Sequence, residues 1–131
     1  IFDRDQVQNF DEIISEAITK GINIGWTNPC IEEWFSAYFG AMPTYANSVS
    51  CCNGFEQIFE RNAHQKYVKS DLAIYEKLNR FGNEEKAIRI AAQKMHDHRI
   101  QGKYKPSEQI PGTTVHLLVD EIKSKINQKE K

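Results

Sequence analysis

The chain opens with Ile1-Phe2-Asp3-Arg4-Asp5, in which an apolar pair runs directly into two acids that are one residue apart. This pattern predicts a buried strand that ends with its carboxylates at the tip. Alternate residues of a strand share one face, so we expect Asp3 and Asp5 to point the same way. Mg²⁺ takes oxygen ligands, often one or two carboxylates together with substrate phosphates. The opening stretch therefore predicts a site for Mg²⁺ or Mn²⁺ at Asp3 and Asp5.

The segment after this strand has apolar residues at helical spacing and then a short alternating stretch. Residues 10–18 predict a helix that Gly21 ends, and residues 21–26 predict a second strand. A strand, a helix and a strand predict a parallel pair with a right-handed crossover. Further helices are predicted at 30–39, 55–68, 71–80, 84–98 and 113–126, with connections at 41–54 and 100–112. The expected fold class is α/β, a β-α-β core followed by a mostly helical half.

The length and composition are those of one globular domain. The chain has 131 residues, 40% of them hydrophobic and 27% charged, which argues against global disorder. We expect a single domain over 1–131, with a partial α/β core at 1–40 and a helical extension at 41–131. The chain begins without Met where a strand is already under way. We therefore expect it to be a fragment that lacks earlier strands of its own sheet.

Two further features of the composition predict the cellular setting. No segment approaches the roughly 18 apolar residues that cross a bilayer, so no membrane partner is expected. The three cysteines include the adjacent pair Cys51 and Cys52, which is not the pattern of a disulfide framework. A reducing, cytoplasmic location is therefore expected.

Charge is distributed unevenly along the chain. Residues 1–60 carry nine acidic and two basic side chains, whereas residues 61–105 carry eleven basic and five acidic ones. This asymmetry predicts a metal site beside a surface that binds a polyanion, and the alternative is two solvated helical faces of opposite sign. Lys66 and Lys69 lie close to Tyr67, and Lys103 and Lys105 flank Tyr104. Basic and aromatic residues in this order suit phosphate pairing and base stacking, so DNA or RNA is the expected partner.

Three motifs together resemble one family. They are the acid-x-acid pair at Asp3 and Asp5, the segment Asn28-Pro29-Cys30-Ile31-Glu32-Glu33-Trp34-Phe35, and the segment Pro111-Gly112-Thr113-Thr114-Val115-His116-Leu117-Leu118-Val119. In this combination and order the chain resembles the RloB family, proteins found with restriction and abortive-infection defence loci. Two positions depart from the family pattern: Ile31 stands in place of an aromatic residue, and Glu33 in place of an apolar one.

The resemblance implies a Toprim-like, metal-dependent nuclease that acts in phage defence, together with a possible ATPase partner. It carries Asp3 and Asp5 over as metal ligands. Such sites also use a glutamate on an earlier strand, and that strand is not in this chain. The resemblance therefore implies that this chain alone is inactive.

The candidate site residues follow from these motifs, each with an alternative. The catalytic candidates are Asp3, Asp5 and Glu32, and the nucleic-acid-binding candidates are Asn28, Lys66, Lys69, Lys103, Lys105 and His116. Asp3 and Asp5 also suit a loop pair that caps the next helix. Glu32 also suits a role in stabilising a helix N-terminus, Asn28 a turn, and His116 a packed core position.

Two other functions remain open. In a haloacid-dehalogenase-type phosphatase, Asp3 would be the nucleophile and Asp5 the acid and base. In a catalytically silent interaction module, the helical half would dock the ATPase partner.

Overall fold

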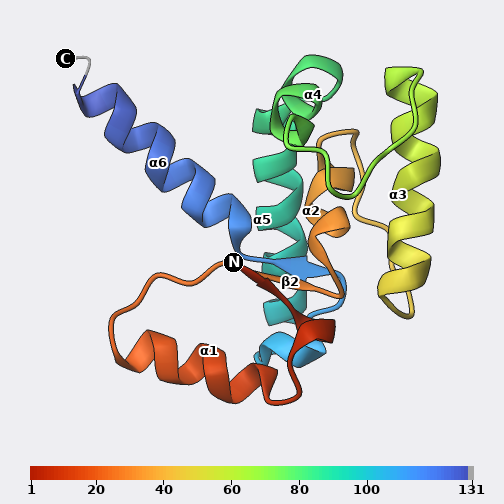
Figure 1. Ribbon diagram of the computed structural model, residues 1–131. Coiled ribbons are helices and arrows are strands. Elements are labelled where there is room, and N and C mark those ends of the chain that lie inside the picture. The colour runs from red at the N-terminus through yellow and green to blue at the C-terminus, as the bar shows by residue number, and fades with distance from the viewer. Residues whose placement is uncertain (130–131) are drawn as a thin grey trace.

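The computed structural model describes residues 1–129, with side chains described through Asn127. Within that range six α-helices surround a small three-stranded sheet (Figure 1). The helices are α1 (Phe10–Thr19), α2 (Ile31–Ala37), α3 (Ser48–Ala63), α4 (Ile74–Phe81), α5 (Glu84–Ile100) and α6 (Val115–Lys129). The strands are β1 (Phe2–Asp3), β2 (Trp26–Asn28) and β3 (Gly112–Thr113), and two 3₁₀ turns are η1 (Arg4–Gln6) and η2 (Pro106–Glu108). The mixed, mostly helical α/β class is confirmed.

The sheet has β2 at its centre. β1 pairs with β2 in parallel, and Asp3 lies beside Thr27 in the register. β3 joins the other side of β2 in the antiparallel direction, with Thr113 beside Thr27. The parallel pair predicted from the β-α-β pattern is therefore confirmed, and the third strand was not predicted.

The position predicted for the second strand, 21–26, is wrong by several residues. The strand runs from Trp26 to Asn28, because Trp26 and Thr27 pair with β1 and Thr27 and Asn28 pair with β3. Gly25 lies so close to α6 that an added Cβ would be 2.5 Å from Leu118 Cδ1. The absence of a side chain at Gly25, just before the strand, thus permits the close approach of α6.

The predicted connection at 41–54 is also wrong in its second half, because α3 begins at Ser48. The side chain of Asn47 accepts a hydrogen bond from the backbone N–H of Ser50 at 2.9 Å, which caps the helix. Phe55 and Phe59 lie four residues apart on its buried face. An Asn followed by small polar residues was interpreted as a loop, whereas it is a helix start.

Two hydrophobic clusters hold the described chain together. The smaller one packs α1 against the sheet through Phe10, Ile14 and Trp26. The larger one joins α2, α3, α4 and α5, and contains a group of aromatic rings: Phe35, Phe39, Phe55, Phe59 and Tyr67. Helix α5 runs through the middle of the molecule beside α2 (Figure 1).

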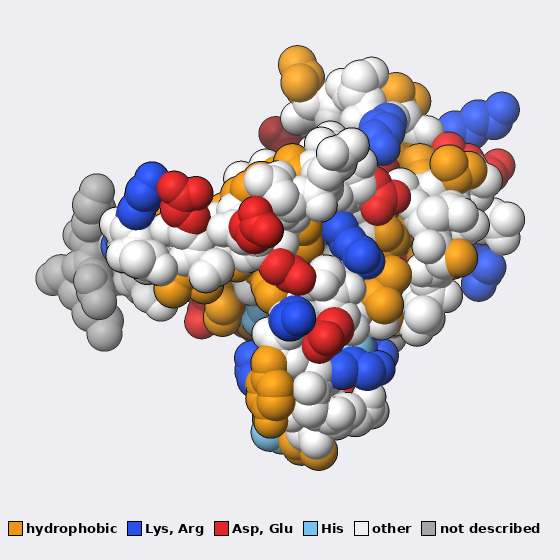
Figure 2. Space-filling model, turned by 90° about the horizontal axis from the view of Figure 1, so that it is seen from below, with side chains coloured by type: hydrophobic (Ala, Val, Ile, Leu, Met, Phe, Trp, Pro, Cys, Tyr) orange, Lys and Arg blue, Asp and Glu red, His pale blue; other side chains and the backbone are white. Residues whose placement is uncertain are grey.

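Helix α6 extends away from the rest of the fold (Figure 1). Along it, the exposed side chains include Leu117, Ile122 and Ile126. Figure 2 shows hydrophobic side chains along this arm, while acidic and basic side chains are interspersed over the rest of the visible face. Within residues 1–129, none of the helices has the length and apolar character needed to cross a membrane.

Candidate metal and nucleic-acid site

The two parallel strands end at the same edge of the sheet and bring the candidate residues to it. Asp3 is the last residue of β1, and β2 ends at Asn28, just before the cis peptide bond to Pro29 and the start of α2. Glu32 and Glu33 lie in the first turn of α2, where carboxylates complement the positive end of the helix dipole. The edge beyond the carboxyl ends of parallel strands is where open α/β sheets bind ligands.

Asp3 is half-buried at this edge and is held from the neighbouring strand. Its Oδ1 accepts a short hydrogen bond from the Thr27 hydroxyl. Burial, together with the charge of Glu32, raises the pKa of Asp3 above 3.8, whereas the Thr27 hydrogen bond and the Lys69 ammonium oppose that rise. The carboxylate of Asp3 therefore senses both Glu32 and Lys69, although the three residues come from three separate segments.

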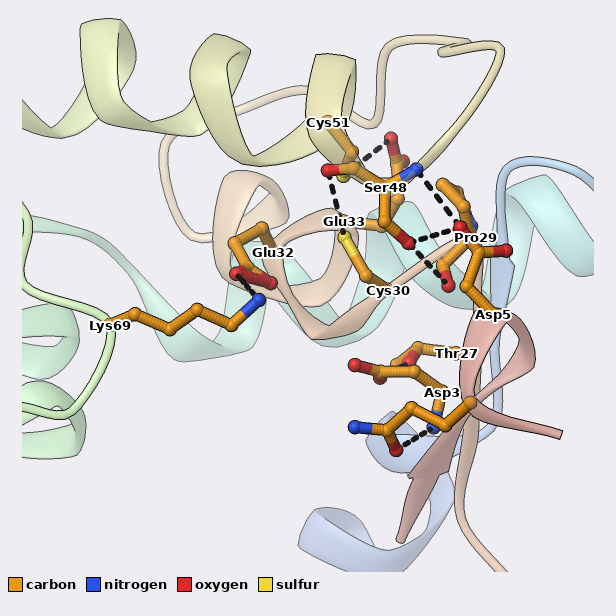
Figure 3. A network of polar contacts seen from close by, with 11 residues as sticks. Asp3, Asp5, Thr27, Pro29, Cys30, Glu32, Glu33, Ser48, Cys51 and Lys69 are labelled. Carbon is orange, nitrogen blue, oxygen red and sulfur yellow. Dashed lines mark hydrogen bonds and ion pairs between the residues drawn. The ribbon is translucent and has the colours of Figure 1, made fainter.

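Glu32 is fully buried, and its carboxylate has a single ion-pair partner among the described residues. Lys69 Nζ lies 3.2 Å from Glu32 Oε1 and approaches from the exposed loop between α3 and α4 (Figure 3). Neither carboxylate oxygen of Glu32 has a hydrogen-bond partner in the described part of the chain. A buried carboxylate in this condition is costly unless a cation completes its environment.

Asp5 does not share a strand face with Asp3, so that part of the prediction is wrong. The strand ends at Asp3, and Asp5 lies in the 3₁₀ turn η1. Its Oδ2 accepts hydrogen bonds from the backbone N–H of Ser48, at 3.1 Å, and from the Ser48 hydroxyl. Asp5 thus binds the N-terminus of α3 at Ser48, whose hydroxyl also lies 3.5 Å from the carbonyl oxygen of Pro29 (Figure 3).

Glu33 was not predicted as a site residue, yet it is as buried as Glu32. Its Oε1 accepts a hydrogen bond from the Cys51 thiol at 3.6 Å, and its Oε2 has no partner among the described residues. Burial raises the pKa of Glu33 to about 8, against the opposing effects of Cys51 and Lys94. The carboxyl group is therefore mostly protonated at neutral pH. The signal in the sequence was that Glu33 stands where the family that the chain resembles has an apolar residue.

The Cys51 thiol near Glu33 is also uncharged. The neighbouring Cys30 thiol and burial both raise the pKa of Cys51. Cys30 and Cys51 are buried and free, and they lie with Glu33 at the first turn of α3. These three residues are part of the buried core, whereas Glu32, one residue away, pairs with the ammonium group of Lys69.

Asn28 is fully buried and directs its amide toward the 106–109 segment. Its Nδ2 donates to the carbonyl oxygens of Pro106, at 3.1 Å, and Gln109, at 3.2 Å. The side-chain oxygen of Asn28, Oδ1, accepts a long hydrogen bond, 3.5 Å, from the guanidinium group of Arg4. The side chain therefore fastens a loop to the end of β2, and all of these contacts are internal.

The remaining nucleic-acid-binding candidates lie in different environments. Lys66 is exposed and borders a hollow of about 250 Å³ with Glu56, Glu60 and Tyr67. Lys103 and Lys105 are exposed in the loop after α5. The structure thus brings Asp3, Glu32 and Lys69 together. Among the described residues, no ion pair links Lys66, Lys103 or Lys105 to the two acids.

His116 lies in the first turn of α6 and is 4% exposed. Burial, with the charge of Arg99, lowers its pKa to about 4, so the ring is neutral at physiological pH. Its Nδ1 has no hydrogen-bond partner among the described residues. This is the packed position that the sequence left open as an alternative.

The oxygen ligands at this edge fit a hard divalent cation. Glu32 has two carboxylate oxygens without a hydrogen bond, and Asp3 shares their surroundings. Over residues 1–129 no set of three or more His, Cys, Asp or Glu side chains is arranged to hold a metal ion. Mg²⁺ and Mn²⁺ tolerate such a short protein contribution, because water and substrate phosphates supply their other ligands. The residues present therefore fit an ion that is shared with a phosphate.

Comparison with known proteins gives one family. The model of the family described as RloB-like protein matches residues 1–122. No curated protein and no solved structure matches the chain.

Proposed function

Because the chain belongs to the RloB-like protein family, we propose that it forms part of a Toprim-like, Mg²⁺- or Mn²⁺-dependent nuclease of a phage-defence system. The observation that supports this most is the meeting of two acids from separate elements, Asp3 and Glu32, at the carboxyl edge of the parallel strands. A parallel β-α-β unit at the N terminus is also what a Toprim-like core requires. The proposed reaction is cleavage of phosphodiester bonds in DNA or RNA.

Each residue near this edge has a distinct part in the proposal. Asp3 and Glu32 would hold the ion, and Thr27 orients the carboxylate of Asp3 through its hydroxyl. A bound divalent ion supplies polarisation of the phosphoryl oxygen and a lower pKa for the attacking water. Lys69 is the nearest ammonium to the two acids and suits a phosphate contact. Asp5 would have an indirect, positioning role, because it holds the start of α3 beside the site.

The proposal extends to nucleic acid and to an ATPase partner. The exposed ammonium groups of Lys66, Lys103 and Lys105 are free to pair with backbone phosphates at a distance from the acids. The ATPase partner rests on the family alone.

Metal-dependent stability tests the site in the chain itself. Mg²⁺ or Mn²⁺ at a saturating concentration should raise the melting temperature of the wild-type protein, because a ligand that binds only the folded state stabilises it. The increase should be lost in Asp3→Asn and in Glu32→Gln. Glu12→Gln, which removes an exposed acid from α1, is the matched control and should keep the full increase.

Cleavage of end-labelled tRNA and of plasmid DNA then tests the reaction, with the chain studied in its complete gene product and with a candidate ATPase added. Cutting that depends on Mg²⁺ and is abolished by Asp3→Asn would establish the nuclease and identify its polymer. Absence of cutting, together with a melting temperature that metal does not change, would exclude it.

A second candidate function is a catalytically silent interaction module. It is favoured by the exposed apolar side chains of α6, which the described residues leave uncovered. Unchanged melting with metal, combined with capture of the ATPase through α6, would select this alternative.

A further inference from the structure

The ion pair between Glu32 and Lys69 joins two residues in very different surroundings. The side chain of Glu32 is 0% exposed, whereas that of Lys69 is 65% exposed. Their closest atoms are 3.2 Å apart, and the contact lacks the geometry of a hydrogen bond. The carboxylate of Glu32 depends on Lys69 for its charge partner. Water solvates the lysine whether or not it keeps the ion pair.

The loop that carries Lys69 is anchored close to the ion pair. Tyr67 packs edge-on against Phe55, with ring centroids 4.7 Å apart, and also contacts Phe35 and Phe59. Since Tyr67 is only two residues before Lys69, the backbone is held while the lysine side chain reaches across to Glu32. The ion pair can therefore break through a change in the conformation of the Lys69 side chain, without movement of the loop backbone.

A hollow beside the ion pair provides a second position for the ammonium group. It measures about 270 Å³ and is lined by Lys69 and by residues of the first turns of α3: Ser48, Val49, Cys52 and Asn53. The first backbone N–H groups of α3 are already used, because that of Ser48 binds Asp5 and that of Ser50 binds Asn47. An ammonium that leaves Glu32 on this side would therefore be the group in the hollow that attracts a phosphate.

Loss of the ion pair costs Lys69 little free energy, whereas the carboxylate of Glu32 then needs another cation in its place. Ion pairs that involve an exposed lysine contribute little, because water solvates the ammonium equally well. A buried carboxylate that loses its partner without replacement is strongly disfavoured. While Glu32 is ionised it therefore needs one positive charge beside it, and either an ammonium or a metal ion supplies that charge.

We propose that Lys69 is the resident counter-ion of Glu32, and that it leaves this carboxylate when a divalent cation binds, so that its ammonium contacts a substrate phosphate in the hollow beside the first turns of α3. This inference rests on the proposed function, because it requires Asp3 and Glu32 to bind the ion. It adds that the charge of Lys69 moves from the site acid to the substrate when metal is present.

The first experiment measures Mn²⁺ affinity by electron paramagnetic resonance. Lys69→Met should bind Mn²⁺ about threefold more tightly or better, because the competing ammonium is gone. Lys66→Met removes an exposed lysine from the same loop and should leave the affinity unchanged.

The second experiment follows the lysine in the wild-type protein, so that it does not depend on the folding of a variant. Lysines are dimethylated with ¹³C-formaldehyde, and the Lys69 methyl signal is identified by its absence in Lys69→Met. Addition of Mg²⁺ should shift this signal in the wild type and leave the Lys66 signal in place. In Glu32→Gln the shift should disappear.

The third experiment tests the contact with phosphate, using a fluorescein-labelled single-stranded oligonucleotide. Lys69→Met should weaken binding more in Mg²⁺ than in EDTA, because only the metal-bound protein offers a released ammonium. Equal weakening in both conditions would overturn the transfer to substrate.

The outcomes separate this inference from the proposed function. If wild-type protein binds Mn²⁺ but Lys69→Met binds it no more tightly and the Lys69 signal does not move, the exchange is excluded and the metal site stands. If neither protein binds Mn²⁺, the exchange and the metal-dependent nuclease are excluded together.

Discussion

Asp3 and Thr27 are partners in the register of the parallel strands, and the hydroxyl of Thr27 donates a hydrogen bond to Oδ1 of Asp3. One contact therefore serves both the pairing of β1 with β2 and the orientation of a site carboxylate. Thr27 is fully buried, so its hydroxyl has no access to water as a substitute partner. The position of Asp3 is thus decided by the strand that follows it in the sheet.

Thr27→Val removes this hydroxyl while it keeps the shape of the side chain. Hydrogen bonds to charged groups contribute about 1.5–3 kcal/mol, so we expect a loss of that order in the free energy of unfolding. The pKa of Asp3 should rise further, because the Thr27 hydrogen bond now lowers it. Urea denaturation and a ¹³C titration of the Asp3 carboxyl group measure the two effects. Thr44→Val, at an exposed threonine, is the control, and an unchanged Asp3 titration in Thr27→Val would contradict the assignment.

Glu33 should make stability depend on pH above the usual range for a carboxyl group. Its pKa is raised from 4.5 to about 8 in the folded protein, so the folded state binds the proton more tightly than the unfolded one. The contribution of Glu33 to stability should therefore be greatest below pH 4.5 and be lost as the pH rises through about 8. Glu33→Gln mimics the protonated form and should lack this loss. At pH 9 its free energy of unfolding should exceed that of the wild type by an amount on the order of 3 to 5 kcal/mol.

Urea denaturation of Glu33→Gln at pH 4, 6, 7.5 and 9 measures the difference. The control Glu12→Gln, at an exposed acid, should give a curve parallel to that of the wild type. A difference between wild type and Glu33→Gln that is constant over this range would show that Glu33 is charged in the fold.

Asn28 should be required for folding more than for nucleic-acid contact. Asn28→Asp replaces an amide donor with a carboxylate that faces the carbonyl oxygens of Pro106 and Gln109. We expect a loss of about 3 kcal/mol or more in unfolding free energy, because one oxygen of the buried carboxylate would face two carbonyl acceptors where the amide now donates. Asn23→Asp, at an exposed asparagine, is the matched control in urea denaturation. Normal stability with weakened oligonucleotide binding would instead assign Asn28 to substrate.

Glu84 should tie α6 to the helical half of the molecule. Its carboxylate accepts hydrogen bonds from Tyr38, at 2.9 Å, and Tyr75, at 2.6 Å, and pairs with Lys123 of α6 at 3.2 Å. Burial raises its pKa, but the two tyrosine hydrogen bonds and Lys123 lower it overall. The contribution of Glu84 to stability should therefore be present above pH 4.5 and disappear as the pH falls through the lowered pKa.

Glu84→Gln should cost about 1–3 kcal/mol at pH 7. Faster amide hydrogen exchange in α6 is expected in the same variant. Its neighbour Glu85 is exposed, and Glu85→Gln should leave both measurements unchanged. Unchanged exchange in α6 with Glu84→Gln would mean that the helix is held by its apolar contacts alone.

Gly112 should tolerate no side chain, in contrast to Gly25. A Cβ at Gly112 would lie 2.3 Å from the backbone oxygen of Gln109, in the loop that Asn28 fastens. A Cβ at Gly25 would meet the end of the Leu118 side chain, which is able to rotate away. We expect Gly112→Ala to lower the melting temperature well beyond Gly25→Ala. Equal effects in thermal unfolding would show that the 106–109 loop yields easily.

Local patterns in the sequence were sufficient for most of the secondary structure and for the family. The spacing of apolar residues in α1, α2 and α5 reflects one buried face of each helix, which is a property of the segment itself. The parallel pairing of the first strands followed from their order around a helix, because that connection has few alternatives. Patterns failed at 41–54, where the cap at Asn47 is a local feature that resembles a loop.

The chemistry of the acids was decided only by tertiary structure. Glu32 and Glu33 are adjacent, equally buried and in one helical turn, yet one faces an ammonium from the α3–α4 loop and the other a thiol of α3. Asp3 and Asp5 have the spacing of a shared strand face, but Asp5 binds Ser48, 43 residues away, because the chain turns after Asp3. Charge state and ligand availability depend on groups that fold back from distant parts of the chain, and no local pattern records which group arrives.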